Sequence, residues 1–306
     1  MLWSFESVFW TLFSQSSGAF VDHHSFATRF FRVQRGLSKG EKGLLRNPFA
    51  RFLPTPSWTL FCKSLDESHE MMSEIIENHN KSPSQDSLLA YLSSYVFEDG
   101  SKLNEEELIA IMIDVLFPAS GFTTPTSMWL LHDVATREDV QRKVFEEALL
   151  SKGDLRQCPY LFAVVRESMR LHPLQDAFVR SSTQEFVVGG YRVPAKVRLS
   201  CVASNTAVSE RYFKEPLNFL PERWMDDESV QSIHPYASTP YGVGTRRCPA
   251  VSSSDIQLAI LVQEAVKRYR LDSDPEEIVD AQYQPLLVPT APFDIAFNAR
   301  EDGEGF

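Results

Sequence analysis

One cysteine of the chain stands in a segment that suits a metal ligand. Residues 241–248 read YGVGTRRC, so two glycines and an arginine precede Cys248, and a helical pattern follows it. The glycines permit a tight bend, which lets backbone amides approach the sulfur and stabilise its negative charge. A thiolate presented in this way is a strong, electron-donating ligand for haem iron, and Arg246 could neutralise a haem propionate. The alternative is an ordinary turn with a buried apolar thiol.

A second group of residues could form a buried ion pair. Glu167 and Arg170 lie three positions apart, which places carboxylate and guanidinium on one face of a helix. The flanking segments LFAVV and LHP favour burial, and a buried pair needs further polar partners. Arg223, in the segment FLPERW, could be one of them. The alternative is a surface salt bridge worth under about 1 kcal/mol.

Helices are predicted for most of the chain before Pro173, because apolar residues recur there at helical spacing. Asn104 and Glu107 form a partial capping box, and Thr136 with Asp139 gives another cap-like start. Pro159 suits the first turn of a helix that ends at His172. The predicted helices cover residues 1–17, 58–78, a segment ending at 97, a segment following 104, 138–150 and 159–172.

Short extended segments are predicted beyond Pro173. EFVV and YRVP flank Gly189 and Gly190, a pattern typical of a hairpin. Residues 214–249 form an irregular, proline-rich stretch, followed by a helix over about 254–269 and a strand pair around LLVPTAPFDIAF. The sequence therefore predicts a mainly α fold with small β-sheets.

Composition and targeting signals limit the function classes. The chain has 41 acidic and 30 basic residues and a formal net charge of −11, which argues against wholesale nucleic-acid binding. The four cysteines are dispersed without a CxxC pair, so neither a disulfide framework nor a zinc site is expected. The N-terminus resembles neither a secretory signal nor a transit peptide. No run reaches the roughly 18 uninterrupted apolar residues of a spanning helix.

Residues 29–51 depart from this acidic balance. They hold seven basic residues against Glu41 alone, interleaved with aromatic and aliphatic residues. A basic stretch of this kind can lie on an anionic membrane surface, so peripheral membrane contact is one interpretation. The other is a solvated loop between helices.

Three motifs in order resemble the cytochrome P-450 superfamily. ExxR occurs at Glu167 and Arg170, FxPERW at 219–224, and the cysteine segment at 241–248 is a variant of FxxGxRxC. The opening WSFESV is similar to a mid-chain helix of the mitochondrial clan of that superfamily. The resemblance implies that Cys248 is the axial ligand of the iron in haem, iron protoporphyrin IX.

The resemblance also implies the architecture. Glu167, Arg170 and Arg223 would form a buried structural triad. Residues 1–306 would be a partial P-450 domain without the N-terminal helices of the fold, and would comprise the long distal helix, triad helix, meander, cysteine loop and last helix. Ala250 stands where the family usually has glycine, and alanine is expected to crowd the backbone near the porphyrin.

Two further residues take roles from the resemblance. The segment ASGFTT at 119–124 is similar to the distal-helix motif, in which Thr123 would hold dioxygen and deliver protons, although Phe122 replaces the usual acid. Its alternative is an ordinary helix hydroxyl bonded to a backbone carbonyl. Pro118 and Pro125 predict a local kink. Arg180 resembles the arginine that holds a haem propionate, with a plain solvated arginine as the alternative.

The implied activity is that of a haem-thiolate monooxygenase, which inserts one atom of dioxygen into a C–H bond and releases the other as water. Electrons would come from an acidic ferredoxin docking near Arg166 and Arg247, while Phe162 stands where the clan often has lysine. The substrate would be lipophilic, possibly sterol-like, as in steroid or lipid metabolism. It would be bounded by residues 116–124, 174–179 and 286–288. The family location is the mitochondrial inner membrane, although this chain shows no targeting sequence.

Two other functions compete with this interpretation. The first is a catalytically inactive, truncated fragment that does not hold haem productively, favoured by Phe122, Ala250 and the N-terminal helices that the resemblance leaves out. The second is a phosphate-binding domain that uses GVGTR. It lacks the strand-to-helix GxGxxG pattern and the P-loop lysine.

Overall fold

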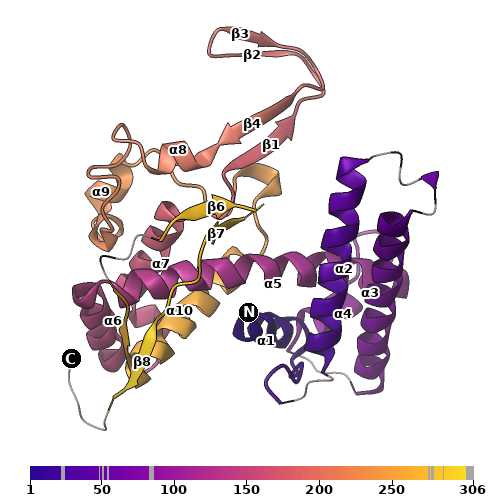
Figure 1. Ribbon diagram of the computed structural model, residues 1–306, viewed down its shortest axis with the longest axis horizontal. Helices are drawn as coiled ribbons and strands as arrows, with labels where there is room; N and C mark the ends of the chain where they lie inside the picture. The colour runs from indigo at the N-terminus through magenta and orange to yellow at the C-terminus, as the bar shows by residue number, and fades with distance from the viewer. Residues whose placement is uncertain are drawn as a thin grey trace. The chain divides into compact units, whose positions relative to one another are not determined.

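The computed structural model describes residues 1–21, 25–47, 49, 52–53, 55–82, 86–274, 276, 279–284 and 286–300. The chain divides into two compact units, Met1–Thr124 and Pro125–Phe306. Helices make up most of the described residues, and the strands form small antiparallel two-stranded sheets (Figure 1). The fold class expected from the sequence is confirmed.

The first unit is helical and has an aromatic core. Phe5 and Phe9 of α1 pack with Phe30 of α2, with ring centroids 4.6 Å apart for Phe5 and Phe30. Met72 of α3 and Leu89 of α4 are buried in the same core. The helices of this unit are α1 (Leu2–Phe13), α2 (Phe26–Arg46), α3 (Pro56–Lys81), α4 (Leu88–Ser94) and the first part of α5 (Glu105–Ala135).

The basic stretch is helical over most of its length. Residues 29–46 belong to α2, which lies beside α3 (Figure 1), so the loop interpretation is wrong for this part. Arg29 pairs with Glu74 of α3 at 2.7 Å, and Arg32 pairs with Glu67. Arg51, the last basic residue of the stretch, lies outside the described residues. Part of the local positive charge is thus neutralised by acids of α3.

Helix α5 begins with the predicted capping box. The Asn104 amide donates to Glu107 Oε2 at 2.9 Å, and the Glu107 amide donates to Asn104 Oδ1 at 3.0 Å. The helix then runs without interruption through Pro118 and Pro125 to Ala135. It is the one helix among the described residues whose length and mean hydropathy, 1.5, would allow it to cross a membrane. Its apolar side chains, such as Met112 and Leu130, belong to the cores of the two units.

The second unit packs its helices around an aliphatic core. Leu130 of α5, Val144 of α6, Val164 of α7 and Val262 of α10 are fully buried in this core. The helical elements of this unit are the end of α5, α6 (Glu138–Leu150), η2 (Leu155–Gln157), α7 (Pro159–Leu171), α8 (Ala203–Ala207), η3 (Pro221–Trp224), α9 (Asp227–Ser232), η4 (Gly244–Arg246) and α10 (Val251–Arg268).

Four antiparallel strand pairs complete the second unit. The predicted hairpin is confirmed, with Gly189 (φ +56°) and Gly190 (φ +82°) supplying the left-handed conformations of its turn. The predicted C-terminal strand pair is wrong, because its two strands pair with other strands. The pairs are β1 (Ala177–Ser181) with β4 (Arg198–Val202), β2 (Phe186–Val188) with β3 (Tyr191–Val193), β5 (Tyr269–Asp272) with β8 (Ala296–Ala299), and β6 (Ala281–Tyr283) with β7 (Leu287–Pro289).

Helix ends show where local signals succeed and fail. Pro159 opens α7, and His172 is its C-cap, as predicted. The helix expected to reach Phe97 ends at Ser94, because residues after it turn back to form a bridge. Thr136 does not cap α6, since its hydroxyl donates to the His132 carbonyl at 2.8 Å and Arg137 takes the N-cap position.

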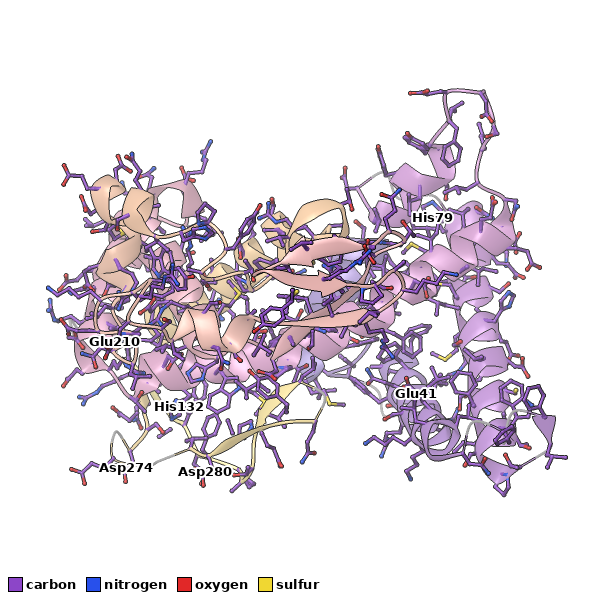
Figure 2. The ribbon with its side chains drawn as sticks, turned by 90° about the horizontal axis from the view of Figure 1, so that it is seen from above. Glu41, His79, His132, Glu210, Asp274 and Asp280 are labelled. Atoms are coloured by element: carbon purple, nitrogen blue, oxygen red, sulfur yellow. The ribbon has the colours of Figure 1, made fainter. Side chains whose placement is uncertain are left out.

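Surface chemistry agrees with the acidic composition. Glu41, Glu210, Asp274 and Asp280 are exposed, and Figure 2 labels them among the side chains of the ribbon. The four cysteines are free thiols, and Cys158 is buried, Cys62 and Cys248 are partly buried, and Cys201 is exposed. Among the described residues no cluster of His, Cys, Asp and Glu could hold a metal ion.

Candidate functional site

The cysteine loop, residues 241–248, is a tight bend that depends on its glycines. Gly242 (φ +71°) and Gly244 (φ +76°) adopt the left-handed conformation that disfavours other residues. The Cys248 amide donates to the Tyr241 carbonyl at 2.9 Å, which closes the loop immediately before α10. The loop thus presents the partly buried Cys248 thiol at the start of a helix.

A hydrogen bond joins the loop to α10. The Tyr241 hydroxyl donates to Asp255 Oδ1 at 2.5 Å. Burial raises the pKa of Asp255, while the Tyr241 hydrogen bond and the charges of Arg166 and Arg247 act in the opposite direction. Burial also raises the pKa of Tyr241, and its bond to Asp255 adds to that shift. The hydroxyl therefore remains a donor at neutral pH.

A cavity of about 590 Å³ lies between α7, the cysteine loop and the start of α10. Arg166 and Arg247, the two residues expected to dock a redox partner, both line it, together with Asp255 and Phe162. The Arg166 guanidinium also stacks on the Trp224 ring, 3.9 Å from its centroid. The structure thus brings the two cations to one cavity, where they face one carboxylate.

Arg246 and Arg180 are both exposed. Arg246 lies in the short turn η4 within the loop, and Arg180 lies on β1, where it donates to the Val179 carbonyl at 3.0 Å. Strand β1 runs beside the loop, because a Cβ added to Gly242 would meet the Phe178 ring at 3.5 Å. Neither guanidinium forms an ion pair with an acid among the residues that the structure describes.

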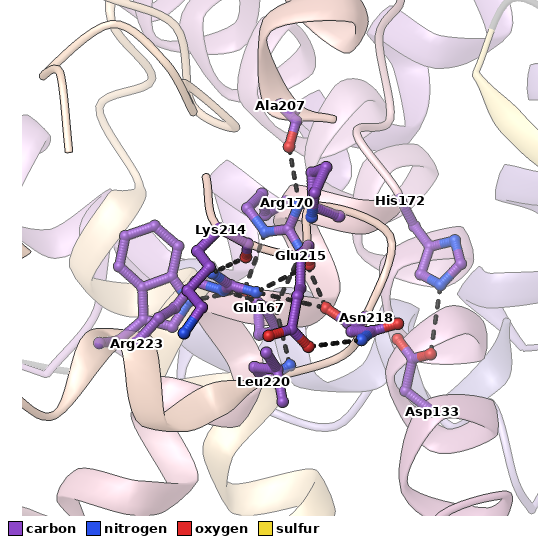
Figure 3. A network of polar contacts seen from close by, with 12 residues as sticks. Asp133, Glu167, Arg170, His172, Ala207, Lys214, Glu215, Asn218, Leu220 and Arg223 are labelled. Atoms are coloured by element: carbon purple, nitrogen blue, oxygen red, sulfur yellow. Dashed lines mark hydrogen bonds and ion pairs between the residues drawn. The ribbon is translucent and has the colours of Figure 1, made fainter. Parts of the chain in front are cut away.

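The Glu167–Arg170 pair is fully buried in α7. Arg170 donates to both oxygens of Glu167, at 2.9 and 2.8 Å. Its other N–H groups donate to backbone carbonyls, at 2.6 Å to Ala207, 2.7 Å to Pro216 and 3.2 Å to Asn218 (Figure 3). All five guanidinium donors therefore have acceptors, as burial of a charge requires.

Arg223 completes the polar contacts of Glu167. Its Nε donates to Glu167 Oε1 at 3.0 Å, and the Leu220 amide donates to the same oxygen at 2.9 Å. The indole of Trp224 donates to Glu167 Oε2 at 2.8 Å, a contact that sequence reasoning missed. The side chain of Glu167 thereby fixes the segment 220–224 against α7, upstream of the cysteine loop.

Thr123 belongs to the first unit. Its hydroxyl donates to the Ala119 carbonyl at 2.8 Å, and the neighbouring Thr124 hydroxyl donates to the Ser120 carbonyl at 3.1 Å. Such bonds from a side-chain hydroxyl to the carbonyl four residues earlier are what the alternative for Thr123, an ordinary helix hydroxyl, predicts. Phe122, which occupies the place of the expected acid, is exposed. Back-bonding and a catalytic role are compatible, because a hydroxyl can rotate to another acceptor.

A buried carboxylate near the end of α5 was not predicted. Asp133 is 1% exposed, and its Oδ1 accepts from Arg137 at 3.0 Å and lies 3.2 Å from His172 Nε2 (Figure 3). Burial by itself would raise the pKa of Asp133, but His172 and Arg137 bring it below its usual range. The His172 ring stacks on Trp129 with centroids 4.3 Å apart. No spacing rule links Asp133 to His172, which lies 39 positions further along the chain.

The residues at the cysteine loop fit haem. Haem needs an axial ligand and cations for its propionates. The loop offers a partly buried thiol and the exposed guanidinium of Arg246, and Arg180 is exposed on β1, the strand whose Phe178 lies beside Gly242. A Cβ at Gly244 would meet nothing within 4 Å, so the loop has open space on that side. Ala250 (φ −94°) has a backbone conformation that alanine adopts without strain.

Known proteins are similar to this chain over nearly its whole length. The family described as "Cytochrome P450" matches residues 4–297. The 1,25-dihydroxyvitamin D(3) 24-hydroxylase, mitochondrial, of Rattus norvegicus is 26% identical over 97% of this chain and 59% of its own length. Cytochrome P450 302a1, mitochondrial, of Drosophila melanogaster is 29% identical over 82% of this chain and 53% of its own length. The chain spans about half the length of the curated relatives it matches.

Solved structures agree on the fold. The crystal structure of the cytochrome P450DA heme domain superposes with a TM-score of 0.86 at 15% identity, over 99% of this chain and 67% of that domain. The likeness establishes the arrangement of helices and sheets. It includes the long helix α5, the triad helix α7 and the last helix α10, so the expected set of fold elements is confirmed.

Proposed function

We propose, since the chain belongs to the cytochrome P450 family, that it is part of a haem-thiolate monooxygenase in which Cys248 ligates the haem iron. The observation that carries the proposal is the cysteine loop. It is bent by two left-handed glycines, closed by the Cys248 amide and placed before α10. Residues 1–306 would then be a partial P450 domain, and the activity would belong to the complete enzyme.

The candidate site residues of the second unit have two proposed tasks. Arg246 and Arg180 would hold the haem propionates by charge-assisted hydrogen bonds. Glu167, Arg170 and Arg223 would fix the segment that leads into the cysteine loop. Haem, when bound, would supply the activation of dioxygen for insertion into a C–H bond.

Thr123 is proposed to hold a proton at its hydroxyl near the oxygen site. The hydroxyl is buried and already ordered by its bond to the Ala119 carbonyl. With Phe122 in place of an acid, the hydroxyl would depend on solvent for protons. Thr123→Ala should therefore lower the yield of product per electron consumed, whereas Thr136→Ala, a matched back-bonded threonine, should leave that yield unchanged.

A lipophilic, possibly sterol-like substrate is proposed from the relatives' names and from the apolar side chains within residues 116–124, 174–179 and 286–288. Relatives named mitochondrial support a mitochondrial location, with the inner membrane as the proposed compartment. A ferredoxin-type protein is the proposed electron donor. Its acidic surface would meet Arg166 and Arg247, which line the same cavity.

Peripheral membrane contact is proposed for the end of α2 and the residues that follow. Leu45, Phe49, Phe52 and Leu53 are 63–75% exposed, and Lys39 and Lys42 are exposed on the same helix. Apolar side chains beside lysines suit an anionic lipid surface. Phe49→Ser with Leu53→Ser should reduce co-sedimentation with vesicles of anionic lipid, while Tyr191→Ser, on the exposed hairpin, should not. Equal binding of the two variants would contradict membrane contact here.

Haem titration tests the main proposal. The chain should take up haem to saturation, and Arg180→Ala and Arg246→Ala should each weaken binding by about tenfold, through loss of a hydrogen bond to a charged group. Arg192→Ala removes an exposed arginine paired with Glu185, so it serves as the matched control. Absence of saturable uptake by the wild type would instead support the competing proposal, a fragment that does not hold haem productively.

A further inference from the structure

Tyr241 is connected to both the cysteine loop and α10. Its carbonyl accepts the Cys248 amide at 2.9 Å, and its hydroxyl donates to Asp255 Oδ1 at 2.5 Å. Tyr241 therefore contacts both the backbone amide of Cys248, the proposed haem ligand, and the side chain of Asp255 in α10. If Tyr241 moves, the acceptor of the Cys248 amide moves with it.

The hydroxyl is the group by which Tyr241 departs from the motif that the loop resembles. The pattern that the loop resembles, FxxGxRxC, has phenylalanine at the first position, and tyrosine differs from it only by the hydroxyl. Here that hydroxyl has a carboxylate within reach, since Asp255 lies in the second turn of α10. Tyrosine at 241 and aspartate at 255 thus form a matched pair.

Asp255 is itself held in place. It lines the cavity of about 590 Å³ together with Arg166 and Arg247, whose positive charges act on it. Its carboxylate is partly buried, and hydrogen bonds to a charged acceptor are stronger than those to a neutral one. The bond from Tyr241 therefore holds the loop against a fixed point on α10.

We propose that the Tyr241–Asp255 hydrogen bond is a positioning element that holds the cysteine loop and sets the orientation of Cys248. The inference rests on the proposed function only insofar as Cys248 is a haem ligand. The geometry of the loop can be tested with or without haem.

Amide hydrogen exchange tests the positioning role without haem. In Tyr241→Phe, the Cys248 amide should exchange about tenfold faster than in the wild type, because the loop opens more often when a hydrogen bond to a charged group is lost. Asp255→Asn, which keeps an acceptor but removes the charge, should give a smaller increase. An unchanged exchange rate at Cys248 in Tyr241→Phe would overturn the proposal.

Tyr160→Phe is the matched control. The Tyr160 hydroxyl donates to Glu222 Oε1 at 3.2 Å, so this variant also removes a tyrosine–carboxylate bond from the second unit, but one between two residues outside the cysteine loop. It should leave exchange at Cys248 unchanged. Equal acceleration in both phenylalanine variants would show a general loss of stability and would also overturn the proposal.

The spectrum of the haem-loaded chain provides the second measurement. The reduced carbon monoxide complex should lose its red-shifted Soret band about tenfold faster in Tyr241→Phe than in the wild type or Tyr160→Phe. The double variant Tyr241→Phe with Asp255→Asn should be no faster than Tyr241→Phe, because one bond is removed. A wild type without the band would refute haem–thiolate ligation, and amide exchange would still decide the role of Tyr241.

Discussion

The triad and the cysteine loop lie in the same unit but are held in different ways. Glu167 and Arg170 are 0% exposed, and every guanidinium donor of Arg170 has an acceptor in the protein. The cysteine loop is partly exposed, contains two left-handed glycines and is tied to α10 by the side-chain bond from Tyr241 to Asp255. The triad is therefore complete within the chain, whereas the loop keeps its thiol and cations available for a ligand.

The difference suggests that the triad mainly stabilises the fold, whereas the cysteine loop mainly serves ligand binding. Residues that hold the fold are expected to change unfolding free energy strongly, while residues of the loop are expected to change ligation more than stability. Functional segments are generally drawn from the less stable parts of a structure. Variants in the two regions can show whether this division is correct.

The largest effect is expected at the triad. Arg170→Ala leaves the Glu167 carboxylate buried without its main partner, which should lower the free energy of unfolding by about 3–5 kcal/mol. Urea denaturation measures this change. Arg192→Ala breaks an exposed pair with Glu185 and should cost under about 1 kcal/mol. Similar losses in the two variants would contradict the scaffold role of the triad.

A smaller effect is expected at Asp133, which joins the end of α5 to His172. Asp133→Asn should cost about 1–3 kcal/mol at neutral pH, because bonds to a charged group are lost. The folded-state pKa of Asp133 lies below its usual value. Its ionised form therefore stabilises the fold above about pH 4, and this contribution is lost as pH falls through the lowered pKa. Urea midpoints across acidic pH should fall less steeply in the variant.

Gly242→Ala tests the backbone of the cysteine loop. A side chain at φ +71° should cost about 1–2 kcal/mol, whereas its Cβ would make only an ordinary contact with the Phe178 ring at 3.5 Å. Gly121→Ala lies within α5, with the nearest side-chain atom at 3.8 Å, and should stabilise the chain by up to about 1 kcal/mol. Thermal unfolding compares the two. Stabilisation by both alanines would contradict the requirement for glycine in the loop.

The smallest effect is expected at the α2–α3 surface. Glu74→Gln removes the exposed ion pair with Arg29 and should change the free energy of unfolding by less than about 1 kcal/mol. The change should shrink further at high salt, because exposed charges are screened. A salt-independent loss of several kcal/mol would show that this surface, too, behaves like the buried triad.

Several features set by neighbouring residues were predicted correctly, although the Thr136 cap and the helix end at Phe97 were not. The Asn104–Glu107 capping box, the start of α7 at Pro159 and the hairpin at Gly189 and Gly190 each depend on a few adjacent positions. The pairing of Glu167 with Arg170 follows from helical spacing, and Arg223 was placed by the resemblance of its motif. Local chemistry is therefore readable from the sequence.

Contacts between distant residues were missed. Trp224 reaches Glu167 across 57 positions, and His172 reaches Asp133 across 39. No periodicity links such residues, because they meet only when the elements pack. The predicted pairing of the C-terminal strands was wrong for the same reason, since β8 pairs with β5 rather than with its neighbour in sequence. Tyr241 was noted as a variant of its motif, but its partner Asp255 was not identified.

The most direct test of haem ligation by Cys248 is the carbon monoxide difference spectrum of the reduced, haem-supplemented chain. The wild type and Cys201→Ser, which removes an exposed cysteine on β4, should both show a strongly red-shifted Soret band. Cys248→Ser should show none, because the thiolate ligand is lost. A band that survives in Cys248→Ser, or is absent from the wild type, would contradict ligation by this cysteine.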